Sequence, residues 1–87
     1  MAFINIGFGN IINSNKIVAM ITSDSAPAKR IVATAKETGT IVDATQGRRT
    51  RCVIVCEEHI VLSALMPDTI ANRITENSIK EESDYDA

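Results

Sequence analysis

The chain has 87 residues, of which 45% are apolar, but only two are Phe, one is Tyr and none is Trp. This length allows one small domain, which buries only about 60–65% of the surface that the unfolded chain exposes. Such a domain often completes its core against further copies of itself. Apolar stretches such as residues 17–21 fall far short of the roughly 20 residues that span a bilayer, and two cysteines exclude a disulfide framework, so we expect a soluble, cytoplasmic protein without a membrane partner. The net charge of −2 argues against a nucleic-acid partner, but the distribution of the charges along the chain does not.

Two strands are predicted before the first helix. Residues 3–8 alternate in part between apolar and polar side chains and end at Gly9-Asn10, and residues 16–22 form a second strand after an Asn-Ser-Asn turn. The segment over residues 7–10, Gly-Phe-Gly-Asn, resembles the start of a dinucleotide-binding loop but lacks the third glycine and the following helix. Its two glycines therefore indicate a bulge or a close approach of the backbone.

A helix is predicted over residues 26–38. Ser25 and the two residues before it offer N-cap side chains, and Pro27 suits the first helical turn, where its missing N–H costs no hydrogen bond. Apolar residues recur at positions 28, 31, 32 and 35, which is the spacing of one helix face. Gly39 suits the position just after the last turn.

Three strands and a second helix are predicted after this helix. The strands are expected at residues 40–44, 49–56 and 59–65, and a short helix begins at Pro67. The order β-β-α-β-β-β-α predicts an α+β fold built on a small antiparallel sheet. We expect residues 1–76 to form one domain and the acidic residues 77–87 to form a disordered tail.

Positive charge is concentrated in the first part of the chain. Residues 1–56 hold seven Lys and Arg against three Asp and Glu, whereas residues 57–87 hold two against eight. In the predicted strand over 49–56, Arg49 and Arg51 lie on one face, roughly 7 Å apart, with Arg48 beside them. Paired guanidiniums suit phosphate oxygens because each presents a planar fork of donors. The residues alone leave open a solvated turn or ion pairs between subunits.

Other cations are less distinctive. Lys29 and Lys36 share one face of the predicted helix, Arg30 is adjacent to Lys29, and Lys16 opens the second strand. A row of this kind is typical of a solvated helix face opposite an apolar stripe. By itself it does not indicate a binding site.

The cysteines and the single histidine do not indicate metal or redox chemistry. On one strand, Cys52 and Cys56 lie roughly 13 Å apart, too far for a disulfide with each other, and the chain has too few further ligands for a closed zinc site. They are expected to face the core with Ile54. Since no nucleophile with a base and no paired carboxylates are recognisable, we expect no enzyme, no metal, no cofactor and no small-molecule substrate.

Four segments of the chain carry distinctive motifs, at residues 3–11, 25–30, 43–51 and 59–64. The most specific is the run Asp-Ala-Thr-Gln-Gly-Arg-Arg-Thr-Arg over residues 43–51. In these motifs, from about residue 3 to residue 74, the chain resembles the RemA family of small bacterial regulators of extracellular matrix and biofilm genes.

The resemblance implies a nucleoid-associated protein that binds double-stranded DNA and assembles into closed homo-oligomeric rings with basic residues around the ring. The family's basic residues match Arg48, Arg49 and Arg51, and a further basic position falls on Lys16, where relatives often carry Arg. The candidate DNA-binding residues are Arg48, Arg49, Arg51, Lys16, Lys29 and Arg30. The alternative is a structural or adaptor homo-oligomer whose basic cluster makes ion pairs between subunits.

Overall fold

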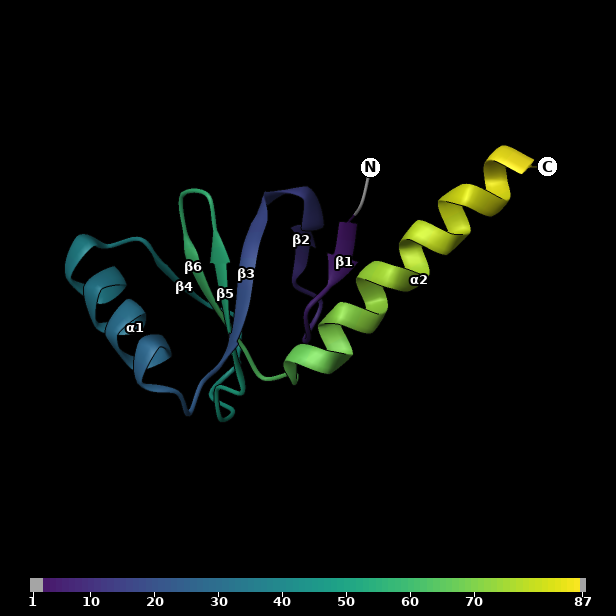
Figure 1. The fold of residues 1–87 in the computed structure, drawn as a ribbon. Helices are drawn as coiled ribbons and strands as arrows, with labels where there is room; N and C mark the ends of the chain where they lie inside the picture. Colours follow the sequence, from purple (N-terminus) through teal and green to yellow (C-terminus); the bar gives the residue numbers. More distant parts are fainter. Residues whose placement is uncertain (1–2, 87) are drawn as a thin grey trace.

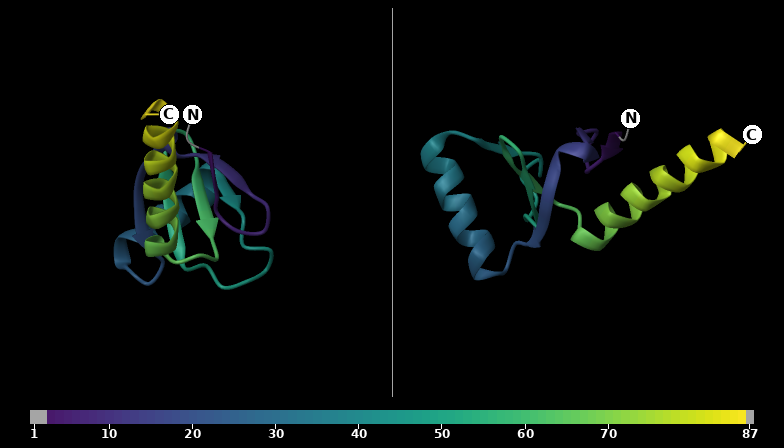
Figure 2. Two further views of the ribbon diagram at one scale, coloured as in Figure 1. Left: turned by 90° about the vertical axis from the view of Figure 1, so that its right-hand side faces the viewer. Right: turned by 45° about the horizontal axis from the view of Figure 1, so that its top comes forward.

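Three layers organise the domain. The computed structural model describes residues 3–86, with the side chains of residues 3–76. A four-stranded sheet lies between helix α1 (Ala26–Thr38) on one face and, on the other, helix α2 (Pro67–Asp86) with a hairpin of β1 (Phe3–Asn5) and β2 (Ile11–Asn13) (Figure 1 and Figure 2). The predicted α+β class is confirmed. In the described part of the chain, no helix is long and apolar enough to cross a membrane.

The sequence predicts an antiparallel sheet, which is wrong for one pair of strands in the central sheet. Its order is β3-β5-β6-β4. β5 (Cys52–Cys56) pairs antiparallel with β3 (Ile17–Thr22) and with β6 (Ile60–Ser63). β4 (Ile41–Asp43) runs parallel to β6. The loop after β4 crosses the end of β6 to reach β5, and the β5–β6 hairpin then brings the chain back to lie beside β4 in the same direction.

Alternation along β5 supplies two apolar cores. Cys52 and Ile54 face the hairpin and α2, and the half-buried Cys56 packs against the same cluster, as predicted. Val53 faces the opposite way and packs beneath α1. The other buried residues of the first core are Ile4, Ile6, Ala44, Val61 and Ile70, and those of the second are Ala28 and Leu62.

The first predicted strand is instead a hairpin. β1 ends at Asn5, the chain turns, and β2 pairs back so that Ile4 lies opposite Ile12. The prediction of a strand up to residue 8 is wrong because Gly7 and Phe8 both have positive φ, 113° and 54°, which a strand does not accommodate. No close approach explains these glycines, because a Cβ at Gly7 would make only an ordinary 3.5 Å contact with Cγ of Leu65 and one at Gly9 would meet nothing within 4 Å; their positive φ values favour glycine instead.

Helix α1 has the predicted bounds and caps. The Ser25 hydroxyl accepts the Ala28 N–H at 3.2 Å, which satisfies one of the free donors of the first turn. Gly39 follows the last turn with φ 72°, in the left-handed region that glycine adopts without steric cost. The predicted cap residues therefore determine both ends of this helix.

Helix α2 begins at Pro67, as predicted, but it is not short, since it continues for 20 residues to Asp86. Ile70 is buried in the first core, and Nη1 of Arg73 donates a 2.6 Å hydrogen bond to the Asn5 carbonyl oxygen, which fixes the helix to β1. The acidic residues 77–87, predicted to form a disordered tail, lie outside the residues whose side chains are described, and that expectation stays a prediction.

Candidate nucleic-acid interface

Residues 44–51, which we call the arginine loop, join β4 to β5 and carry the three predicted arginines. The Thr45 hydroxyl and N–H both donate to Oδ1 of Asp43, at 2.6 and 2.9 Å. The hydroxyl bond, followed by the backbone bond, lowers the pKa of the Asp43 carboxyl, because hydrogen bonds to the charged form favour it. Gln46 and Gly47 then take left-handed φ values of 53° and 77°, so the loop reverses sharply just before Arg48.

Residues 6–10, which we call the glycine turn, form a second tight reversal. The Gly7 N–H donates to Oδ1 of Asn5 at 2.7 Å, and Nδ2 of Asn10 donates to the Gly7 carbonyl oxygen at 2.8 Å. The Ile6 N–H and the Asn10 carbonyl oxygen close the turn at 2.9 Å. At its tip, Phe8 holds a left-handed backbone and exposes 52% of its surface.

The glycine turn and the arginine loop meet at the surface. Nδ2 of Asn10 reaches the Ala44 carbonyl oxygen at 3.4 Å, and Cζ of Arg48 lies over the Phe8 ring, 6.0 Å from its centre. This distance is the outer limit of a cation–π contact. A shallow pocket of about 400 Å³ lies between the two turns. It is lined by Phe8, Arg48, Arg49, Arg51, Ala64 and Leu65.

Arg49 and Arg51 do not lie on a strand face, which corrects the prediction. β5 begins only at Cys52, so the two arginines extend from loop backbone. That backbone is nevertheless held on both sides, because the Arg51 N–H donates to the Ser63 carbonyl oxygen at 2.9 Å and the Ser23 N–H donates to the Arg51 carbonyl oxygen at 3.3 Å. Two exposed guanidiniums thus extend from an anchored segment at one end of the sheet.

Arg49 makes an exposed ion pair. Its Nη2 lies 3.5 Å from Oδ1 of Asp24, and the two side chains are 70% and 82% exposed. Such a pair is weak in water and exchanges readily for another anion. The contact lies within one chain, whereas the sequence left open ion pairs between subunits.

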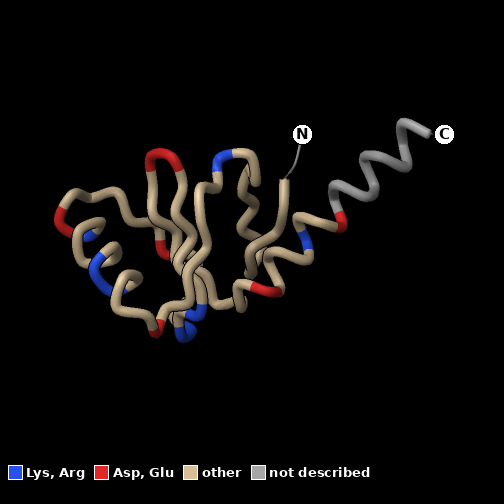
Figure 3. The backbone as a smooth tube through the Cα atoms, in the orientation of Figure 1, with Lys and Arg blue, Asp and Glu red and all other residues tan. Residues whose placement is uncertain are grey.

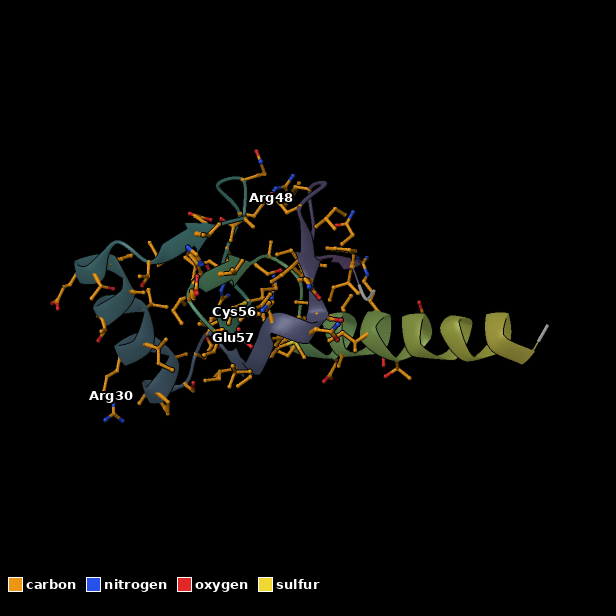
Figure 4. The ribbon with its side chains drawn as sticks, turned by 90° about the horizontal axis from the view of Figure 1, so that it is seen from above. Arg30, Arg48, Cys56 and Glu57 are labelled. Carbon is orange, nitrogen blue, oxygen red and sulfur yellow. The ribbon has the colours of Figure 1, made fainter. Side chains whose placement is uncertain are left out.

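The other predicted cations are not gathered with the arginine loop. Lys16 lies at the opposite end of the sheet, because Ile17 pairs with Cys56 at the end of β5 far from Arg51, and its Nζ is 3.3 Å from Oε2 of Glu57. Figure 3 shows basic segments at both of these ends. Arg30 points away from the body of the domain, on the side opposite Arg48 (Figure 4). Lys29 lines a pocket with Ser23 and Thr50 beside the arginine loop. Lys36 lines the same pocket.

The cysteines have the character of core residues. Both are free thiols, and burial raises the pKa of Cys52 to about 11 and raises the pKa of Cys56 above its ordinary value. A raised pKa disfavours the reactive thiolate at neutral pH. Among the described residues, no group of three or more His, Cys, Asp or Glu side chains is placed to hold a metal ion.

Sequence reasoning missed Phe8 and Asp24 as residues of this surface. An aromatic side chain between two glycines, followed by Asn, is a signal of an exposed turn tip. Its position beside Arg48, forty residues further along the chain, follows only from the packing of the hairpin on the sheet.

Comparison with known proteins gives a consistent family assignment. Residues 3–74 match the RemA-like family, described as extracellular matrix regulatory protein A-like. "Putative regulatory protein STH1338" of Symbiobacterium thermophilum is 55% identical over 73 residues, which cover 83% of this chain and 77% of the relative. Relatives with the same type of name come from Thermoanaerobacter sp. (strain X514), 56% identical over 85% of this chain and 78% of the relative, and from Caldicellulosiruptor saccharolyticus, 50% identical over 95% and 83%. The chain therefore belongs to the RemA-like family.

Proposed function

We propose that this protein is a DNA-binding transcriptional regulator that assembles into a ring and bends or wraps promoter DNA around it, with extracellular matrix genes as targets. The regulatory role agrees with the family and with the names of its relatives, which describe regulators and not enzymes. The observation that carries DNA binding is the arginine loop. Three exposed arginines lie around one shallow pocket at one end of the domain.

The charge of a single subunit is too small for tight binding. Each phosphate that is neutralised contributes about −0.9 to the slope of the logarithm of the binding constant against the logarithm of the salt concentration. One subunit offers only the cations of the arginine loop and its near neighbours for such contacts. A ring repeats the loop at regular intervals, and linked weak sites gain affinity through effective concentration. Since guanidiniums on phosphates carry no sequence information, target choice would come from DNA shape and bendability.

A second function is favoured by one contact. Arg49 pairs with Asp24 at 3.5 Å within the chain, so the cluster is able to take protein carboxylates as partners. In an adaptor oligomer, Arg48 and Arg51 would likewise pair with acids of a neighbouring subunit. Such an oligomer would need its arginines for assembly and would ignore DNA.

Replacing arginines separates the two functions. We expect the double variant Arg49→Ala/Arg51→Ala to keep the native mass in light scattering and to lose binding to a ~100-base-pair duplex. Lys36→Ala provides the control, because it removes one exposed positive charge from α1, as Arg51→Ala does from the loop. Arg51→Ala should weaken binding clearly more than Lys36→Ala.

Two results would reject the assignment. If the double variant binds the duplex as the wild type does, the arginine loop is not the DNA site. If it dissociates to smaller species while the wild type ignores DNA, the adaptor function replaces the proposed one.

A further inference from the structure

We infer that Phe8 is an apolar wedge that enters the DNA stack between two base pairs while the arginines of the adjacent loop hold the flanking phosphates. This inference rests on the proposed DNA-binding function and adds to it a residue that kinks the duplex. It assigns a role to the one exposed aromatic side chain that lies against the arginine loop.

The geometry sets Phe8 at the tip of a stiff turn. The residue has φ 54° between Gly7 at 113° and Gly9 at 77°. A phenylalanine in the left-handed region costs conformational energy that a more permissive residue would avoid. Side chains on both sides of the tip, Asn5 and Asn10, bond to the turn's own backbone at 2.7 and 2.8 Å. The ring therefore extends from a backbone that is already fixed before any ligand arrives.

The residues around Phe8 are suited to a DNA duplex, because they are positively charged and DNA is negatively charged. The ring is 52% exposed, and it shares its pocket with Arg48, Arg49 and Arg51. Proteins that kink DNA insert an apolar side chain between base pairs and compensate the lost stacking with cationic contacts to the groove and backbone. Phe8 would supply the inserted apolar side chain, and the three neighbouring guanidiniums would supply the cationic contacts.

A subunit interface is the competing explanation for an exposed ring. Burying Phe8 between subunits would also bury the neighbouring guanidiniums, and a charge removed from water needs a partner. Within the described residues, the ion pairs place one carboxylate at this loop, that of Asp24 beside Arg49. Polyanionic DNA meets the charge of all three arginines, so the observations favour DNA.

Phe8→Asn is the test variant, because Asn tolerates the left-handed backbone and removes the ring without straining the turn. Permanganate oxidises thymines that are unstacked, so it reports a wedge directly. On a ~100-base-pair duplex of mixed sequence, wild-type protein should produce discrete reactive thymines. Phe8→Asn should abolish them and weaken binding about thirtyfold, the middle of the range for one stacked aromatic. Its salt dependence should keep the wild-type slope, because no cation is removed.

Two further variants serve as controls. Phe8→Leu keeps an apolar wedge and should retain most of the permanganate reactivity. Phe3→Ala removes the other phenylalanine, which is 51% exposed on β1, and should leave the thymine pattern unchanged.

Each remaining outcome is decisive. Wild-type protein that binds the duplex without reactive thymines, or a Phe8→Asn variant with the wild-type pattern, overturns the wedge and leaves DNA binding intact. A Phe8→Asn oligomer of reduced mass shows Phe8 to be a subunit contact and also overturns it. Failure of the wild type to bind the duplex at any salt removes the proposed function itself.

Discussion

The Ser63 hydroxyl donates a 2.8 Å hydrogen bond to the Ile6 carbonyl oxygen in the interior between the central sheet and the β1–β2 hairpin. Ser63 has no exposed surface, and its oxygen also accepts the Leu65 N–H at 3.1 Å. One buried side chain thus connects β6 to the start of the glycine turn. We expect this connection to help hold Phe8 beside Arg48.

Ser63→Ala should lower the free energy of unfolding by about 1–3 kcal/mol, because it leaves the buried Ile6 carbonyl oxygen and the partly buried Leu65 N–H without this partner. Urea unfolding followed by circular dichroism measures the change. Thr75→Ala is the control, since its hydroxyl bonds to Ala71 on the exposed surface of α2 and its loss should cost less than about 0.5 kcal/mol. An unchanged unfolding midpoint for Ser63→Ala would contradict the role of this bond.

Asp24→Asn should strengthen DNA binding. The substitution frees Arg49 from its exposed ion pair, and such a pair is worth up to about 1 kcal/mol, equivalent to roughly fivefold in affinity. Fluorescence anisotropy with a labelled duplex measures the gain. Glu37→Gln removes the same charge from the far end of α1 and should change the affinity less. Equal gains in both variants would show that only net charge matters and that Arg49 is not a local contact.

The Asp43 carboxylate contributes a pH-dependent stabilisation to the arginine loop. Its pKa in the folded protein is lowered, chiefly by the Thr45 hydroxyl, so the charged form is favoured by folding. The stabilisation is therefore fully present above the unfolded pKa of about 3.9 and is lost as the pH falls through the lower folded value. Thr45→Val should raise the Asp43 pKa in an NMR titration. A pKa that stays at the wild-type value would contradict this hydrogen bond.

Cys52 should resist alkylation in the folded protein. Its pKa of about 11 keeps the thiol protonated at pH 8, and its side chain has no exposed surface. Iodoacetamide labelling followed by mass spectrometry should therefore modify Cys56 first and Cys52 only after addition of denaturant. Rapid labelling of Cys52 without denaturant would show that the central sheet opens readily.

Local signals predicted local structure well. Helix α1 has the expected bounds because Ser25, Pro27 and Gly39 determine its ends through contacts within a few residues. β2 escaped prediction because its last residue, Asn13, opens an Asn-Ser-Asn run that is typical of a turn, which left only Ile11 and Ile12 before it. The parallel pairing of β4 with β6 escaped it because neighbours in a sheet depend on where a loop crosses, and no residue in either strand encodes that crossing.

The candidate site was predictable in composition but not in geometry. The arginines are evident as a cluster in the sequence, yet strand alternation was the wrong argument for Arg49 and Arg51, because the sheet begins only after them. The glycines around Phe8 indicated a turn. Only the packing of the hairpin against β6 brings Phe8 to Arg48, and such a contact between distant segments leaves no periodic trace in the chain.

The most direct test of the central claim is the salt dependence of binding to a ~100-base-pair duplex, with the mass of the protein measured by light scattering in the same samples. We predict a defined oligomer that binds the duplex at low salt and releases it steeply as salt rises, with a log–log slope several times the −0.9 expected per phosphate. A defined oligomer that ignores the duplex at every salt concentration would contradict DNA binding and would favour the adaptor function.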